Sequence, residues 1–138
     1  MNPLDFLDTA ARLLAIDTPT EADVRTAISR SYYAVFHHVL SWWKRNDRFP
    51  DYKDRGHAKI QMTLFNAGIP AARDFSKSLR RLNHHRREAD YELAINFNLR
   101  RGQSAFDLAR RAIADFDAID KITLSEGIGD YLRKTNQI

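Results

Sequence analysis

The sequence predicts an all-α protein, an antiparallel bundle of four main helices and one shorter helix. Apolar residues recur at intervals of three and four along most of the chain, which is the spacing of an amphipathic helix. Only five glycines and four prolines interrupt the 138 residues, and no stretch shows the apolar–polar alternation of a half-buried strand. These features favour helices that pack their apolar faces into one shared core.

Start and stop signals divide the chain into five predicted helices. Asn2-Pro3 is typical of a helix start, and Thr20 with Asp23 resembles a capping box for the second helix. Gly68 is expected to stop the third helix and Pro70 to start the fourth. The predicted helices cover about residues 3–16, 20–45, 57–66, 70–97 and 104–119.

The remaining segments are predicted as loops and a tail. The polar, proline-containing segment 46–56 is expected to be a loop, and 99–104 a turn before Ser104 and Asp107 cap the fifth helix. Residues 1–122 are then expected to form one helical domain, and the length of the chain suits a single core. Residues 123–138 are expected to be a C-terminal tail with room for one short helix.

Composition narrows the classes of function. The formal net charge of +4 and a pI near 9.6 are compatible with an anionic partner. No apolar run approaches the roughly 20 residues of a membrane span, and the acidic residues near the N-terminus do not fit a signal peptide, so no membrane partner is expected. The absence of cysteine excludes disulfides, thiolate metal sites and a cysteine nucleophile, and it fits a cytoplasmic location.

The histidines do not predict a metal site. Four of the five form adjacent pairs, His37-His38 and His84-His85, whose side chains point about 100° apart on a helix. Neither pair has the i, i+4 spacing of zinc motifs, and His57 stands without partners at a helix start. We expect no metal and no cofactor, and we interpret His37 and His38 as packing and hydrogen-bonding residues.

A basic cluster, LRRLNHHRREADYE at residues 79–92, is the most unusual segment. On a helical wheel Arg80, His84, Arg87 and Tyr91 lie opposite the apolar stripe of the fourth helix, and Arg81 and His85 lie on one flank. Arg86 falls on the stripe itself, four residues before Asp90, and predicts a structural ion pair. The predicted core stripe consists of Phe75, Leu79, Leu82, Ala89, Leu93 and Phe97.

Two stretches together resemble the HEPN family, the "higher eukaryotes and prokaryotes nucleotide-binding" helical domains. AISRSYYAVFHHVLSWW at residues 27–43 is similar to the family's aromatic helix, and LRRLNHHRREADYELA at 79–94 is similar to its helix with Arg, a spacer, His and Ala-Asp-Tyr. The resemblance covers roughly residues 3–120 and leaves the tail unexplained.

The resemblance implies a homodimer that brings two Arg–His helices together. Many active members are metal-independent endoribonucleases of toxin–antitoxin systems, with Arg, four to six spacer residues and then His. Arg80 and His85 match this pattern with a spacer of four, whereas Arg80 and His84 fall one short. Asn83 would be the polar spacer residue. The Tyr that commonly follows His in members paired with a nucleotidyltransferase antitoxin is replaced here by Arg87.

Such a ribonuclease uses the 2′-hydroxyl of RNA as its nucleophile and needs only proton transfer and cations. We assign phosphate binding to Arg80, general acid–base catalysis to His85 with His84 as its substitute, and orientation of the ribose or phosphate to Asn83. The expected RNA- or nucleotide-binding residues are Arg81, Arg87 and Tyr91. Because a five-residue spacing separates Arg80 from His85 by about 140°, they converge only if the helix is distorted or a second subunit supplies one of them.

Other interpretations remain open at this point. Relatives that carry Ala-Asp-Tyr but lack the ribonuclease motif act as non-catalytic modules, which would bind a nucleotide or a partner nucleotidyltransferase. General nucleic-acid binding is the weakest alternative, because 18 acidic residues are interleaved with the 22 basic ones. The basic cluster is also compatible with an ordinary solvated helix face.

Overall fold

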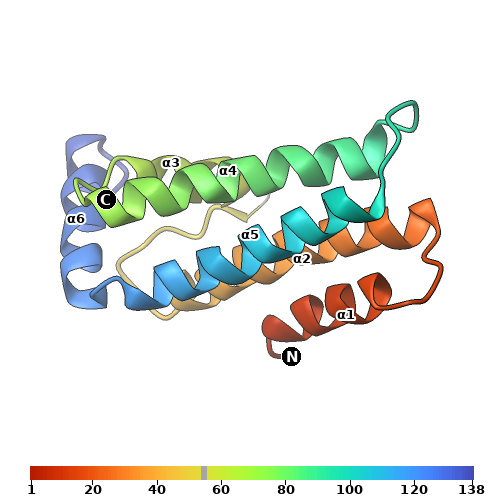
Figure 1. The fold of residues 1–138 in the computed structure, drawn as a ribbon. Coiled ribbons are helices and arrows are strands. Elements are labelled where there is room, and N and C mark those ends of the chain that lie inside the picture. The colour runs from red at the N-terminus through yellow and green to blue at the C-terminus, as the bar shows by residue number, and fades with distance from the viewer. Residues whose placement is uncertain (54–55) are drawn as a thin grey trace.

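The protein consists of six helices in the computed structural model, which describes residues 1–53 and 56–138. The described residues contain no strand, so the all-α prediction is confirmed. Residues 54–55 of the predicted loop 46–56 lie outside the described residues. The helices are α1 (Leu4–Leu14), α2 (Glu21–Lys44), α3 (Gly56–Phe65), α4 (Pro70–Tyr91), α5 (Leu99–Ala118) and α6 (Lys121–Lys134) (Figure 1).

The three long helices α2, α4 and α5 run side by side and pack on one another, with α1 against α2 and α3 against α4 (Figure 1). The helix α6 lies across one end of this bundle. The predicted capping box is present, because the Thr20 side chain accepts from the Asp23 N–H at 3.1 Å and the Asp23 carboxylate accepts from the Thr20 N–H at 2.9 Å. The core is continuous across the long helices; among its fully buried side chains are Tyr32, Trp43, Phe75, Leu79, Leu82 and Phe116.

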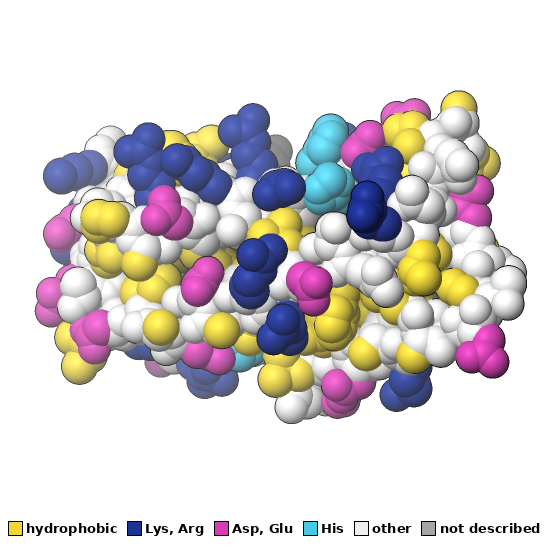
Figure 2. All heavy atoms as spheres, in the orientation of Figure 1, with side chains coloured by type: hydrophobic (Ala, Val, Ile, Leu, Met, Phe, Trp, Pro, Cys, Tyr) yellow, Lys and Arg dark blue, Asp and Glu magenta, His cyan; other side chains and the backbone are white. Residues whose placement is uncertain are grey.

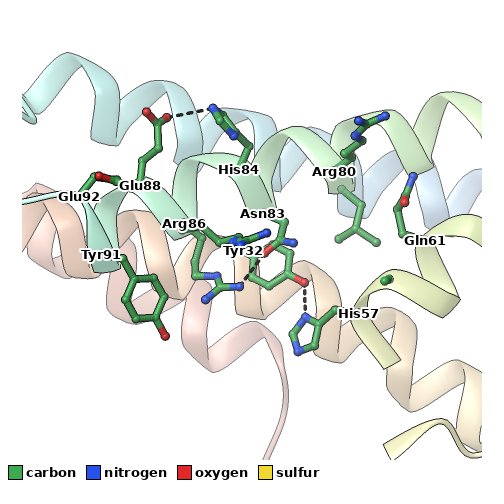
Figure 3. Close-up of a pocket in the computed structure, with 13 residues that line it drawn as sticks. Tyr32, His57, Gln61, Arg80, Asn83, His84, Arg86, Glu88, Tyr91 and Glu92 are labelled. Atoms are coloured by element: carbon green, nitrogen blue, oxygen red, sulfur yellow. Dashed lines mark hydrogen bonds and ion pairs between the residues drawn. The ribbon is translucent and has the colours of Figure 1, made fainter. Parts of the chain in front are cut away.

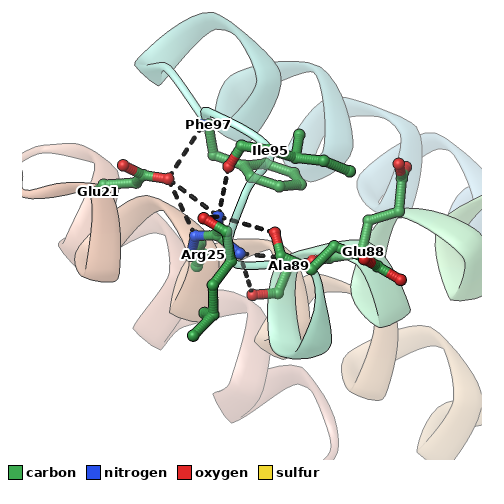
Figure 4. Close-up of polar contacts among 8 residues, drawn as sticks. Glu21, Arg25, Glu88, Ala89, Ile95 and Phe97 are labelled. Carbon is green, nitrogen blue, oxygen red and sulfur yellow. Dashed lines mark hydrogen bonds and ion pairs between the residues drawn. The ribbon is translucent and has the colours of Figure 1, made fainter.

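The helix α4 ends at Tyr91, six residues before the predicted end. Phe97 is buried as predicted but lies in the α4–α5 connection, and Leu93, predicted to be in the core, is 81% exposed. The helix stops where the Arg25 guanidinium of α2 donates to successive carbonyl oxygens, including those of Ala89 at 2.8 Å and Ile95 at 2.5 Å (Figure 4). A guanidinium at a helix C-terminus satisfies carbonyls that have no partner in the helix and complements the helix dipole.

The predicted turn at 99–104 is wrong, because these residues form the first part of α5. Asn98 caps the helix by accepting from the Arg101 N–H at 3.0 Å, in place of the predicted Ser104. Gly102, in the middle of the predicted turn, is a helical packing position. A Cβ atom there would lie 2.7 Å from the Leu14 side chain and 3.0 Å from that of Val24, so glycine allows α1 and α2 to approach α5.

The C-terminal segment forms a helix of 14 residues that belongs to the core of the bundle. Leu124, Ile128 and Leu132 are 0% exposed and lie in the same hydrophobic cluster as the buried residues of α2, α4 and α5. At Gly127 an added Cβ would lie 2.3 Å from the Ala67 carbonyl oxygen, which shows how closely α6 approaches the α3–α4 turn. The expected boundary at residue 122 therefore does not separate a tail from the packed structure.

Candidate functional site

A cleft of about 830 Å³ lies between α3 and α4 and reaches down to α2 (Figure 3). We call it the α3–α4 cleft. Eight of its lining residues come from α4, which makes the basic cluster of the sequence its main wall. The lining residues are Tyr32, His57, Ala58, Gln61, Leu79, Arg80, Asn83, His84, Arg86, Arg87, Glu88, Tyr91 and Glu92.

Five of the seven predicted site residues line this cleft together. They are Arg80, Asn83, His84, Arg87 and Tyr91. In Figure 3 Arg80 and His84 point outward from α4, whereas Asn83 points toward Tyr32 and the interior of the cleft. Arg80, His84 and Arg87 follow one another at intervals of four and three, so a regular helix places them on successive turns of one face.

The other two predicted residues, Arg81 and His85, are not among the residues that line the cleft. His85 is half-buried, and burial is the main cause that lowers its pKa below the ordinary value, followed by the nearby positive charges of Arg101 and Arg81. This shift favours the neutral form of the imidazole, which lies near Arg101 of α5. Within one protomer Arg80 and His85 do not share the cleft.

The floor of the cleft is an aromatic and polar pair that sequence reasoning did not find. The Tyr32 hydroxyl is hydrogen-bonded to Nδ1 of His57 (Figure 3). The imidazole of His57 also stacks on Phe36, with 3.9 Å between the ring centroids. Burial raises the pKa of Tyr32. Burial lowers the pKa of His57, and the positive charge of Arg86 lowers it further. Both shifts favour neutral groups.

His57 was missed because its partners come from other helices. Tyr32 and His57 lie 25 residues apart, and no spacing within α3 indicates a contact with α2. Tyr32 belongs to the aromatic stretch 27–43 that resembles the HEPN family. That resemblance concerns the sequence pattern and predicts no contact between Tyr32 and His57.

The predicted ion pair between Arg86 and Asp90 is present, with 3.7 Å between Nη1 and Oδ2. Arg86 is 13% exposed at its side chain, donates to the Asn83 Oδ1 at 2.7 Å, and lies 5.4 Å from the centroid of the Tyr32 ring. Its Nε is buried without a hydrogen-bond partner among the described residues. Arg86 is thus a structural cation that ties α4 to α2 beneath the cleft and fixes the carbonyl end of Asn83.

The rim of the cleft combines paired and outward cations. The Glu88 carboxylate accepts from Arg101 at 3.4 Å and lies 3.2 Å from Nε2 of His84, so one carboxylate contacts side chains of both α4 and α5. Arg80 and Arg87 are exposed and make no hydrogen bond or ion pair with any residue in 1–53 or 56–138. Figure 2 shows Lys and Arg side chains along the edge formed by α4, with the histidines beside them.

These side chains are suited to a phosphate-bearing ligand. Guanidinium groups offer planar, bidentate recognition of phosphate oxygens, and imidazole and amide groups can both donate and accept hydrogen bonds.

In the part of the chain that the structure describes, no group of three His, Cys, Asp or Glu side chains is placed to hold a metal ion. None of the described helices has both the length and the apolar character needed to cross a bilayer.

Comparisons with known proteins give no assignment. No protein-family model matches the chain, no curated protein sequence matches it significantly, and no solved structure does so either. The resemblance to the HEPN family therefore rests on the motifs of the sequence.

Proposed function

We propose that the protein is a HEPN-like module that binds the phosphate groups of a nucleotide or RNA in the α3–α4 cleft. The observation that carries this proposal is the alignment of Arg80, His84 and Arg87 on successive turns along one wall of a cleft. Two of these three side chains are exposed cations with no partner in the described residues, so a ligand phosphate would meet donors that are already accessible.

The remaining lining residues fit the other parts of a nucleotide. Tyr91 is 74% exposed at the end of the cleft, where its ring can stack on a base. The Asn83 carbonyl accepts from Arg86, which leaves its amide to donate to a ribose or phosphate oxygen. Glu88 and Glu92 line the same cleft and set a limit on how much negative charge can be accepted there.

Binding is tested with inorganic phosphate, nucleoside triphosphates and short RNA, measured by thermal stabilisation and by titration. The double variant Arg80→Gln with Arg87→Gln should weaken binding of every phosphate ligand by at least tenfold. The matched control is Arg110→Gln with Arg111→Gln, which removes the same charge from an exposed part of α5. An equal loss in both double variants would show that only net charge matters and would reject the cleft as the site.

A second candidate, metal-independent endoribonuclease activity, is favoured by the presence of a histidine and an arginine in the same cleft. Arg80 could hold the scissile phosphate while His84 transfers a proton to or from the 2′- or 5′-oxygen. The assignment of His85 as the acid–base group requires the second subunit of a homodimer to bring that imidazole to the Arg80 of its partner. A toxin–antitoxin role, with a nucleotidyltransferase as the partner, belongs to this second candidate.

The two histidines are separated by measuring cleavage of single-stranded RNA in EDTA by His84→Ala and His85→Ala. Loss of cleavage in His84→Ala alone supports a site within one protomer. Loss in His85→Ala alone, together with a dimer in light scattering, supports the composite site. If the wild-type chain does not cleave RNA and its expression does not arrest growth, the non-catalytic binding module is the correct function.

A further inference from the structure

The exposed face of α4 carries a continuous basic stripe that is longer than the α3–α4 cleft. Its five members follow one another at intervals of four, three, four and three residues, and at about 100° per residue they fall within about 80° of one another. The stripe lies opposite the buried face of the helix, which contains Phe75, Leu79 and Leu82. The five members are Arg73, Lys77, Arg80, His84 and Arg87.

A second hollow, of about 630 Å³, accompanies the first half of this stripe. Arg73 and Lys77 line it from α4, and it is closed on the other side by the end of α3 and the α3–α4 turn. We call it the turn hollow. The α3–α4 cleft and the turn hollow thus lie between the same two helices, and the basic stripe borders both of them. The residues that line the turn hollow are Phe65, Asn66, Gly68, Ile69, Pro70, Arg73, Asp74 and Lys77.

The opposite wall does not repel a polyanion. The sequence of α3, Gly56–Phe65, contains no Asp or Glu. Met62, which lies in the sequence of α3 between Gln61 of the cleft and Phe65 of the turn hollow, has an apolar side chain that is 50% exposed. The Arg73 guanidinium lies 4.6 Å from the centroid of the Phe65 ring, a cation–π contact that holds the charge at the mouth of the turn hollow. A basic edge facing apolar and aromatic surface is the arrangement that single strands use, with phosphates on one side and bases on the other.

We propose that Arg73 and Lys77 form a second phosphate-binding subsite, which continues the α3–α4 cleft into a groove for a single RNA strand. This inference rests on the proposed function and extends it from a nucleotide pocket to a strand-binding site. The stripe from Arg73 to Arg87 is about 21 Å long, at about 1.5 Å per residue, whereas the part that borders the cleft, from Arg80 to Arg87, is about half of that. A mononucleotide would occupy only the cleft, and a strand of several nucleotides would contact both subsites.

One carboxylate, Asp74, also lines the turn hollow. It lies about 100° from Arg73 on the helix, outside the basic stripe, so a strand that follows the stripe passes beside it. Its charge should weaken binding at this subsite without blocking it.

The test measures binding of fluorescein-labelled 2′-O-methyl oligouridylates, which cannot be cleaved through a 2′-hydroxyl. Strands of four and of eight nucleotides are titrated by anisotropy against wild-type protein, Arg73→Gln with Lys77→Gln, and the Arg110→Gln with Arg111→Gln control. We expect the first double variant to bind the eight-nucleotide strand about tenfold more weakly and the four-nucleotide strand within about twofold of wild type. For the longer strand, a plot of the logarithm of the binding constant against the logarithm of the salt concentration should be less steep than for the wild type by about 1.4. Each of the two lost phosphate contacts accounts for about 0.7 of this slope.

The outcomes separate this inference from the proposed function. If both strands bind wild type equally well and Arg73→Gln with Lys77→Gln changes neither affinity, the subsite is absent but the cleft remains the binding site. Equal weakening in the α5 control also overturns the subsite, because the effect would then be one of net charge. If wild type binds neither strand nor inorganic phosphate, the proposed function and the subsite fail together.

Discussion

The cation at the C-terminal end of α4 and the cations along its outer face differ in what they contact. At the C-terminal end Arg25, 11% exposed, donates to the backbone carbonyls of residues 89, 92 and 95, pairs with Glu21 at 3.0 Å and lies 4.6 Å from the Phe97 ring centroid (Figure 4). Along the outer face, Arg80 and Arg87 are exposed and make no such contact with the described residues. One cation is committed to the fold, and the other two are available to a ligand.

Charge alone therefore does not identify a binding residue. All these arginines belong to or touch the same helix, yet the guanidinium that holds the α4–α5 connection has its donors filled by carbonyl oxygens. Arg86 is intermediate, since its side chain is only 13% exposed and contacts Asp90 and Asn83, but it keeps one donor without a partner among the described residues. The extent to which each arginine is buried, and the number of its N–H groups that have partners, therefore indicate how much the arginine contributes to the fold. A substitution at each position tests this contribution.

Arg25→Ala should have the largest effect on stability. The substitution leaves several carbonyl oxygens at the end of α4 without a donor and removes a cation from the helix C-terminus, so we expect the free energy of unfolding to fall by about 2–4 kcal/mol. Urea or thermal unfolding measures this change. Arg110→Ala, at an exposed pair with Asp107, is the control and should change stability by less than about 0.5 kcal/mol. Equal losses in both variants would contradict the role given to Arg25.

Arg86→Met should have an intermediate effect, a loss of about 1–2 kcal/mol. Methionine keeps much of the buried volume but removes the ion pair with Asp90 and the hydrogen bond to Asn83. A double-mutant cycle with Asp90→Asn should give a coupling energy of about 1 kcal/mol. If the two substitutions are simply additive, the ion pair contributes nothing and Arg86 packs only as an apolar stem.

The sequence could predict those features of the arginines that depend only on residue spacing within one helix. The i, i+4 pair of Arg86 and Asp90 and the outward position of Arg80 follow from the angular spacing of residues on α4, and the structure confirms the pair. The end of α4 could not be predicted, since Arg25 comes from α2 and acts through backbone atoms more than 60 residues away. Periodicity continued the helix through Leu93 because nothing local signals that stop.

Two glycines lie in segments where packing decided the structure for a related reason. Gly102 lies in the predicted turn and Gly127 in the predicted tail, but both are in helices where the absence of a Cβ allows a neighbouring element to approach. Sequence patterns report local conformational freedom, whereas these glycines are required by packing between distant segments. The Tyr32–His57 floor of the cleft is a contact of the same non-local kind.

Acid should destabilise the cleft before it affects the Arg25 end. Burial lowers the pKa of His57 in the folded chain below its ordinary value of 6.5, so protonation favours the unfolded chain and stability is lost as pH falls below about 6.5. His37 and His85 shift in the same direction. The pKa of Glu21 is lowered by its hydrogen bond with Arg25, so its contribution is lost only below its ordinary value of 4.5.

Melting temperatures between pH 7.5 and pH 5.5 check this expectation. The melting temperature of the wild type should fall over this range, and His57→Gln should reduce the slope even though it removes the hydrogen bond with Tyr32. Gln61→Ala changes the same cleft wall without removing a titratable group, so its slope should equal that of the wild type. An unchanged slope in His57→Gln would assign the acid sensitivity to the other buried histidines.

Arg80→Gln and Arg87→Gln should have the smallest effect on stability, within about 0.5 kcal/mol of the wild type, because exposed side chains without intramolecular partners contribute little to folding. The same variants should each weaken phosphate binding about tenfold, since a charge-assisted hydrogen bond to phosphate is lost. Unfolding and binding are measured on the same samples.

A loss of stability above about 1 kcal/mol would show that these arginines, like Arg25, contribute to the fold, and it would remove the physical basis for treating the α3–α4 cleft as a binding site. Unchanged stability with unchanged binding would leave them as a solvated helix face. Only the combination of unchanged stability and lost binding fits side chains whose partner is a ligand.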